Sequence, residues 1–313
     1  MENMNAEIAS MDELLQTIPT VRYGDWRRDA VRGGALHLSA VLPAVSAAIG
    51  HPVATRIHHD PEALRVALGV PKADSVIVAL VDGLGYWNLR MRVGHSPYLR
   101  ALLRDESNDR PIATCAPSTT VAAMAAFGTG TCPGLTGMAG YTQRNTQTGE
   151  LSQLIQFDNA IAPLDLQREP TVFETLRAAG VRVTSCGLPK FADSPADEGC
   201  RCAVRTTRAI CGRCGRVRAA CEASKTPGLT YLYIRDADKV GHAYGWESEQ
   251  WTAVFERVDE QLAQLHRLAP RGTLIVIVAD HGMVGRIRTS ASMSPRIPSS
   301  PGAWPWSAGS PGL

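Results

Sequence analysis

The stretch that decides the fold is Ser75-Val-Ile-Val-Ala-Leu-Val81, which runs directly into Asp82-Gly-Leu-Gly85. Every residue between Ser75 and Asp82 is apolar, and most of them are β-branched. An uninterrupted apolar run, rather than an alternation of apolar and polar residues, is typical of a strand that is buried on both faces. We therefore predict that a central strand of a parallel sheet lies here.

Similar runs recur further along the chain. Residues 230–234 read Thr-Tyr-Leu-Tyr-Ile and precede Asp236, and residues 273–279 read Thr-Leu-Ile-Val-Ile-Val-Ala and precede Asp280. A weaker run lies at 181–187, after a stretch with helical periodicity. Strands that alternate with helices form βαβ units. The sequence thus predicts an α/β fold with a mostly parallel β-sheet flanked by helices on both faces.

The bulk composition is that of an ordinary globular protein. The chain has 313 residues, enough to bury a sizeable core. Of these residues, 44% are hydrophobic and 20% are charged. The formal net charge of +2 gives no electrostatic reason to expect a nucleic acid duplex or an anionic membrane as partner. Residues 1–18 show no secretory signal, and no apolar run approaches the roughly 18 residues of a membrane span. We therefore expect a cytoplasmic protein with reduced cysteines and no membrane partner.

Composition divides the chain into parts. Residues 1–70 have helical spacing and suggest a peripheral N-terminal lead-in, with a solvated loop at 58–59 around His58. Residues 71–285 hold the strand pattern and are the predicted core. Within them, 196–224 is an atypical insert rich in cysteine and arginine, whose poorly spaced cysteines favour free thiols over structural zinc. Residues 286–313 are rich in Ser, Pro and Gly, and we predict a disordered tail.

Acidic residues follow the three strongest strands. Asp82 follows the first, Asp236 comes shortly after the second, and Asp280 with His281 follows the third. The carboxyl ends of parallel strands meet at one edge of a sheet, where open α/β folds bind their ligands. Asp238 and His242 are four residues apart, so a helix would place both on one face. Carboxylate oxygen and imidazole nitrogen are ligands of zinc, and the sequence therefore predicts a shared metal site.

A run of hydroxyl residues, Pro117-Ser-Thr-Thr120, stands directly before an apolar stretch at 121–127. A hydroxyl residue that opens a helix lies beside backbone N–H groups that can receive phosphate oxygens. The same pattern also describes an ordinary helix N-cap, and the two roles are compatible.

The ordered set of these motifs over residues 75–283 resembles the alkaline phosphatase superfamily, in particular its type I phosphodiesterase / nucleotide pyrophosphatase branch. The motifs that carry the resemblance are Asp82-Gly-Leu-Gly85, Pro117-Ser-Thr-Thr120 with Thr129-Gly130, Asp238-Lys-Val-Gly-His242, and Asp280-His281-Gly-Met283.

The resemblance implies an alkaline-phosphatase-like core at 71–285 that hydrolyses phosphodiester or nucleotide pyrophosphate bonds in a small-molecule phosphate ester or nucleotide. It implies a Thr120 nucleophile, which is phosphorylated and then released by water; Thr119 and then Ser118 are the alternatives. It also implies two divalent ions, for which we expect zinc. The implied ligands are Asp82, Thr120, Asp280 and His281 for the first ion, and Asp238 and His242 for the second.

The chain also departs from the family pattern. The family supplies a third histidine to the second ion well after the Asp-His-Gly motif, and this chain has no histidine after His281. Ala123 stands where the family often has an asparagine, and Thr136 stands where it often has a histidine. These departures leave open a truncated or degenerate homologue with little activity, or a phosphomonoesterase of the same superfamily. The abrupt change of composition after Val284 leads us to expect that the C-terminal part of the fold is missing, as a frame shift would produce.

Overall fold

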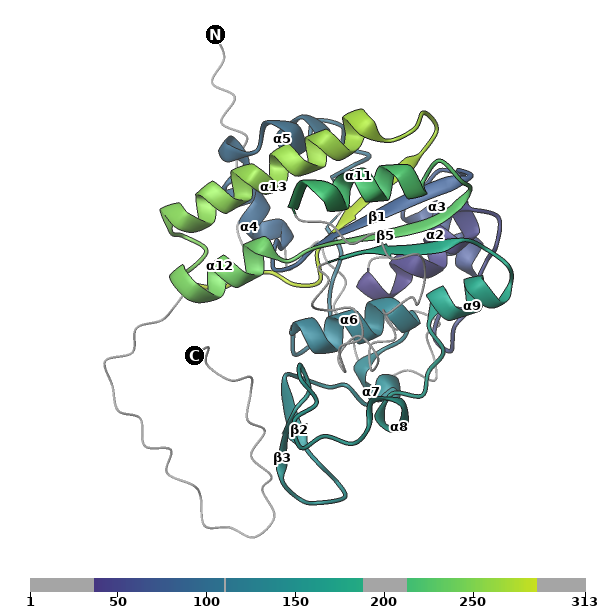
Figure 1. Cartoon of the computed structure of the whole chain (residues 1–313), viewed down its shortest axis with the longest axis vertical. Coiled ribbons are helices and arrows are strands. Elements are labelled where there is room, and N and C mark those ends of the chain that lie inside the picture. The colour runs from purple at the N-terminus through teal and green to yellow at the C-terminus, as the bar shows by residue number, and fades with distance from the viewer. Residues whose placement is uncertain (1–36, 110, 188–212, 286–313) are drawn as a thin grey trace.

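The computed structural model describes residues 37–109, 111–187 and 213–285, and these form a parallel four-stranded sheet with helices on both faces (Figure 1). The strand order is β4-β5-β1-β6, and every neighbouring pair is parallel. The strands are β1 (Ser75–Val81), β4 (Val183–Cys186), β5 (Gly228–Ile234) and β6 (Leu274–Val278). Each coincides with a predicted apolar run, so the predicted α/β fold is confirmed.

Both faces of β1 are covered, which is why its sequence is apolar without interruption. Val78 and Leu80 belong to the hydrophobic cluster on one side of the sheet, and Ile77 and Ala79 belong to the cluster on the other. The helices on the first side are η1 (Leu38–Ala40), α2 (Val41–Ala48), α6 (Thr120–Thr129) and α9 (Val172–Ala178). The helices on the second side are α4 (Tyr86–Met91), α5 (Pro97–Leu102), α11 (Arg213–Ala223), α12 (Asp236–Tyr244) and α13 (Glu249–Leu268).

Smaller elements connect these layers. They are the helices α3 (Pro61–Ala67), η2 (Val93–His95), α7 (Pro133–Thr136) and α8 (Pro163–Leu166), and a hairpin of β2 (Thr142–Arg144) with β3 (Leu151–Gln153). None of the helices in the described ranges combines the length and apolar character that a membrane span requires.

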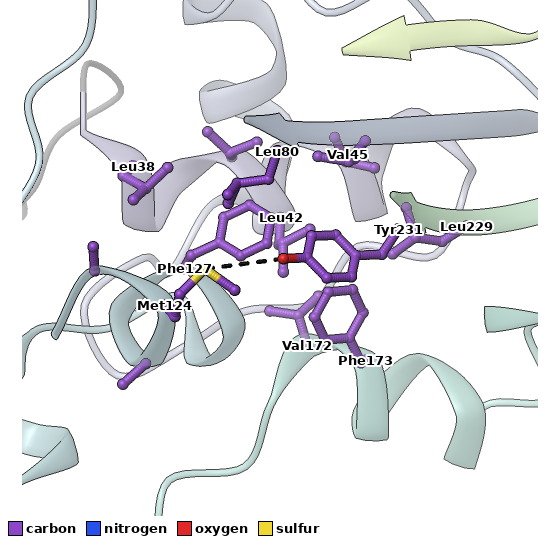
Figure 2. Close-up of a cluster of buried hydrophobic side chains, with 14 of the residues drawn as sticks. Leu38, Leu42, Val45, Leu80, Met124, Phe127, Val172, Phe173, Leu229 and Tyr231 are labelled. Atoms are coloured by element: carbon purple, nitrogen blue, oxygen red, sulfur yellow. Dashed lines mark hydrogen bonds between the residues drawn. The ribbon is translucent and has the colours of Figure 1, made fainter. Parts of the chain in front are cut away.

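An aromatic cluster fixes α6 beneath the sheet (Figure 2). Phe127 of α6 lies 5.8 Å from the ring of Tyr231 on β5, and Phe173 of α9 lies 5.7 Å from the same ring. All three side chains are buried, and such pairs stabilise the fold by about 1 kcal/mol each beyond the burial of their area. The contact holds the whole of α6 in place, and with it the hydroxyl residues at its N-terminus.

The N-terminal region is more deeply buried than its sequence indicates. The predicted helical spacing is present in α2, but every residue of this helix is buried, so it is part of the core rather than peripheral. The expectation of a solvated loop at His58 is wrong, because the ring of His58 is only 3% exposed. Its Nε2 atom lies 2.9 Å from Oγ of Ser39, which in turn lies 2.8 Å from Nδ1 of His37. Polar partners distant in sequence thus allow a polar stretch to be buried.

The described part of the predicted cysteine-rich insert is a helix. Residues 188–212 lie outside the described residues, as do 1–36 and the predicted tail at 286–313. From Arg213 onward, α11 packs on β4 and β5 and buries Val217 and Cys221. Arg216 is 1% exposed and pairs with Asp236 at 3.3 Å, so this helix is tied to the beginning of α12.

Candidate metal centre

Two adjacent strands bring three candidate ligand side chains together. β1 ends before Asp82 and β6 ends shortly before Asp280, and because the strands are parallel neighbours both residues leave the sheet at the same edge. Nε2 of His281 lies 3.6 Å from Oδ1 of Asp82 and 3.6 Å from Oδ2 of Asp280. The potential ligand atoms of these three buried residues all lie within 4.8 Å of one another. The structure therefore brings together Asp82, Asp280 and His281, as predicted for adjacent strand ends.

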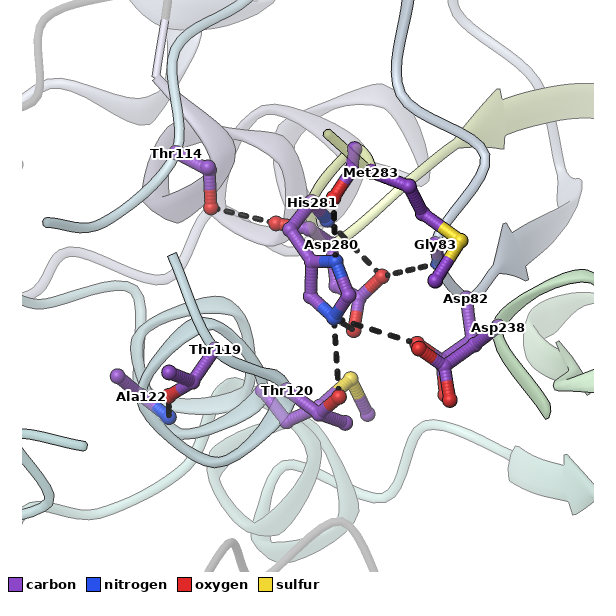
Figure 3. Close-up of polar contacts among 12 residues, drawn as sticks. Asp82, Gly83, Thr114, Thr119, Thr120, Ala122, Asp238, Asp280, His281 and Met283 are labelled. Carbon is purple, nitrogen blue, oxygen red and sulfur yellow. Dashed lines mark hydrogen bonds and ion pairs between the residues drawn. The ribbon is translucent and has the colours of Figure 1, made fainter. Parts of the chain in front are cut away.

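Thr120 completes the group from the opposite side (Figure 3). It is the first residue of α6, and its Oγ1 lies 3.0 Å from Nε2 of His281. Thr119 instead occupies the N-cap, where its Oγ1 accepts a hydrogen bond from the N–H of Ala122 at 3.4 Å. Of the two threonines, Thr120 is the one whose hydroxyl contacts the ligand group, whereas Thr119 caps the helix.

The tautomer of His281 follows from its backbone contact. Nδ1 lies 3.0 Å from the carbonyl oxygen of Gly282. A carbonyl oxygen can only accept, so Nδ1 carries the proton and donates it. The lone pair of a neutral ring is then on Nε2, the atom that faces Thr120 and the two carboxylates. This arrangement is the one found at histidines that bind metals, whose second nitrogen donates to a carbonyl or carboxylate.

Several neighbours hold the carboxylates in place. The N–H groups of Gly83 and His281 donate to Oδ1 of Asp280 at 3.0 and 2.9 Å. The hydroxyl of Tyr233 donates to Oδ2 of Asp82. Sequence reasoning did not identify the role of Tyr233, because in a buried strand its position looks like part of the apolar run; only the pairing of β5 with β1 places its hydroxyl beside Asp82.

The electrostatics of the group are those of a cation site. Burial, followed by the charges of Asp280 and Asp238, raises the pKa of Asp82 well above its usual value. Burial also raises the pKa of Asp280 to about 6, although the neighbouring Asp82 and the hydrogen bond from the Gly83 amide oppose this. Oδ1 of Asp82 and Oδ2 of Asp280 are buried and accept no hydrogen bond from any group in the described ranges. Two buried carboxylates with free acceptor atoms fit a divalent cation, which would supply the missing partner.

Asp238 and His242 lie next to this group on α12. Nε2 of His242 is 3.2 Å from Oδ1 of Asp238, which confirms that the spacing of four residues places them on one helix face. The N–H of Asp238 donates to the carbonyl oxygen of Asp82 at 3.1 Å, so the helix begins directly on the first ligand loop. The His242 side chain remains 60% exposed, and its hydrogen bond to Asp238 raises its pKa. Ala123 and Thr136, where the chain departs from the family pattern, are fully buried in the structure.

Comparisons with known proteins concern the family and the fold of the chain. The family model described as type I phosphodiesterase / nucleotide pyrophosphatase matches residues 76–287. No curated protein matches the chain. Among solved structures, the murine ectonucleotide pyrophosphatase/phosphodiesterase 5, an inactive threonine-to-alanine variant in complex with AMP, is similar with a TM-score of 0.50 and 18% identity, over 67% of this chain and 57% of that one.

A second solved structure matches a similar share of the chain. Phosphonoacetate hydrolase from Sinorhizobium meliloti 1021, in complex with phosphonoformate, matches with a TM-score of 0.46 and 20% identity, over 68% of this chain and 57% of that one. The chain thus spans less than two thirds of the length of these solved structures. At such identities the similarity concerns the fold, and the ligands belong to those proteins.

Proposed function

The chain belongs to the type I phosphodiesterase / nucleotide pyrophosphatase family, and from this premise we propose that it is a metal-dependent hydrolase that cleaves phosphodiester or nucleotide pyrophosphate bonds. The observation that carries the proposal is the position of the Thr120 hydroxyl, 3.0 Å from Nε2 of His281 and beside two buried carboxylates with free acceptor atoms. A hydroxyl, an imidazole lone pair and two carboxylates are the groups that metal-assisted attack on phosphorus requires.

Each residue has a role in the proposal. Asp82, Asp280, His281 and Thr120 would hold one divalent ion, and Asp238 with His242 would hold a second. The mixture of carboxylate and imidazole ligands favours zinc. When bound, such ions lower the pKa of a hydroxyl nucleophile and neutralise the charge that develops on the phosphoryl oxygens.

Thr120 is the proposed nucleophile. Its Oγ1 would form a bond to phosphorus while the bond from phosphorus to the leaving oxygen breaks, and water would later release the phosphoryl group from the threonine. Because Thr120 is the first residue of α6, the backbone N–H groups of that first turn would lie near the transferred phosphoryl group and could receive its oxygens. In the murine neighbour, the threonine-to-alanine form is inactive and is bound to AMP. This supports a small nucleotide or related phosphate ester as substrate.

The proposal is tested by hydrolysis of two chromogenic esters. Bis(p-nitrophenyl) phosphate is a diester and p-nitrophenyl phosphate is a monoester, and each is offered to the chain with zinc or with a chelator. We expect zinc-dependent cleavage that favours the diester. A preference for the monoester would instead indicate that the chain is a phosphomonoesterase. If the folded, zinc-loaded protein cleaves neither ester, the proposed activity is refuted.

A further inference from the structure

The segments that carry the ligands pack against one another through glycines. A Cβ atom on Gly83 would lie 2.9 Å from Cα of Asp238, so the loop after β1 touches the start of α12. A Cβ on Gly85 would lie 2.4 Å from Cα of Gly282, so the same loop touches the loop after β6. These are backbone contacts, shorter than a side chain permits. They fix the position of the loop after β1 relative to α12 and to the loop after β6.

A third contact, made by a side chain, joins the loop after β6 to α12. A Cβ on Gly241 would lie 2.0 Å from Sδ of Met283 and 2.5 Å from its Cε atom. Gly241 lies on α12 between Asp238 and His242, the two residues of the second ligand pair. The thioether of Met283 therefore occupies the space that any other residue at 241 would need. It joins the loop of Asp280 and His281 to the helix of Asp238 and His242.

The backbone of Met283 is held from another element. The side-chain amide of Asn88, on α4, donates to the carbonyl oxygen of Met283 at 2.8 Å and accepts the Met283 N–H at 2.8 Å. Asn88 is 1% exposed, so both bonds are shielded from water. The backbone of Met283 is thus held by Asn88, and its side chain packs against Gly241, directly after the Asp280-His281 motif.

We propose that Met283 is a positioning residue that sets the distance between the two groups of metal ligands, with Asn88 as the support for its backbone. This inference rests on the proposed function, because the distance matters only if both groups hold metal. Neither residue touches the reacting atoms. This role requires a side chain large enough to fill the space beside Gly241. A shorter side chain would let α12 move toward the loop after β6 or become less ordered.

The proposal predicts a reciprocal rescue. Met283→Ala leaves a gap at Gly241, and Gly241→Ala places a methyl group where the Met283 thioether lies and forces that side chain to shift. Either change should loosen the contact that orders the Asp238–His242 pair. The double variant should recover in part, because the new methyl group fills part of the vacated space. Met283→Leu, which nearly conserves volume, is the matched control.

The first readout is zinc affinity, measured by competition with a chelating dye. It is measured only on variants that circular dichroism shows to be folded. We expect each single variant to weaken the second zinc by about tenfold, the usual effect of a residue that supports a metal ligand, while the first zinc is retained. Met283→Leu should bind both zinc ions like the unaltered chain, and the double variant should bind the second ion more tightly than either single variant. Single variants that bind both ions normally, or a double variant no better than the singles, would overturn the proposal.

Hydrogen exchange of the metal-free protein is the second readout. Peptides covering α12 should lose protection in Met283→Ala and recover it in Met283→Leu and, in part, in the double variant, with α9 as an unaffected reference. Equal protection of α12 in all variants would overturn the positioning role. An unaltered chain that binds no zinc would instead refute the proposed metal centre, and the exchange data would then decide separately whether Met283 orders α12.

Discussion

Acidification from about pH 8 to about pH 5 should weaken the fold through two buried histidines, His37 and His58, which are 2% and 3% exposed. Burial lowers the pKa of each from 6.5 to about 4, and for His58 the nearby His37 and His59 add to the effect. The N–H of Ser39 donates to Nδ1 of His37, a bond that a protonated ring could not accept. As the pH falls below 6.5, the unfolded chain binds protons that the folded chain excludes, so the free energy of unfolding decreases until the pH reaches about 4.

The size of the effect follows from the two pKa values. The full difference between 6.5 and about 4 corresponds to about 3 kcal/mol for each histidine. At about pH 5 the unfolded histidines are almost fully protonated while the folded ones are mostly neutral, which gives a loss of about 2 kcal/mol each and about 4 kcal/mol for the pair. That is a large fraction of the stability of a typical domain.

Urea unfolding at both pH values measures this loss. Asp82 and Asp280, whose pKa values are raised, act in the opposite direction because the folded state favours their protonated forms. The comparison is therefore made between variants, in which that contribution is shared. His58→Gln should lose about 2 kcal/mol less than the unaltered chain on acidification. His51→Gln, at an exposed position, should behave like the unaltered chain. Equal losses in all three proteins would refute the reasoning.

Two further predictions concern the ligand loops. Tyr233→Phe removes the hydroxyl that donates to Asp82 and should lower zinc affinity by about tenfold; a chelator competition that shows unchanged affinity would contradict this. Gly83→Ala and Gly50→Ala both strain a glycine with positive φ (+73° and +78°), at about 1 kcal/mol each, but only the methyl group at Gly83 meets the backbone of Asp238. Urea unfolding should therefore show a clearly larger loss for Gly83→Ala, and equal losses would show that the close approach has no energetic cost.

The sheet and part of the site could be predicted because local sequence determines them. The uninterrupted apolar run before Asp82 is a direct consequence of burial on both faces of β1, and parallel pairing then necessarily brings Asp82 and Asp280 to one edge. The helix that places Asp238 and His242 on one face was likewise predictable, because four residues make nearly one helical turn.

The rest depends on contacts between residues far apart in the sequence. The choice of Thr120 over Thr119 came from resemblance, whereas the structure distinguishes them by the 3.0 Å contact with His281. The burial of His58 depends on Ser39, and the hydrogen bond of Tyr233 depends on strand order. No local pattern contains such information. The pairing of the buried Arg216 with Asp236 is likewise a contact between residues distant in the sequence.

The most direct test of the central claim compares Thr120→Val with Thr119→Val in zinc-dependent hydrolysis of bis(p-nitrophenyl) phosphate. The two changes are chemically identical and adjacent, but only Thr120 contacts His281, whereas Thr119 caps α6 and its loss should cost about 1 kcal/mol of stability. We predict that Thr120→Val retains zinc and loses hydrolysis, while Thr119→Val retains most of the activity. Hydrolysis that survives in Thr120→Val, or that is lost equally in both variants, would contradict the account.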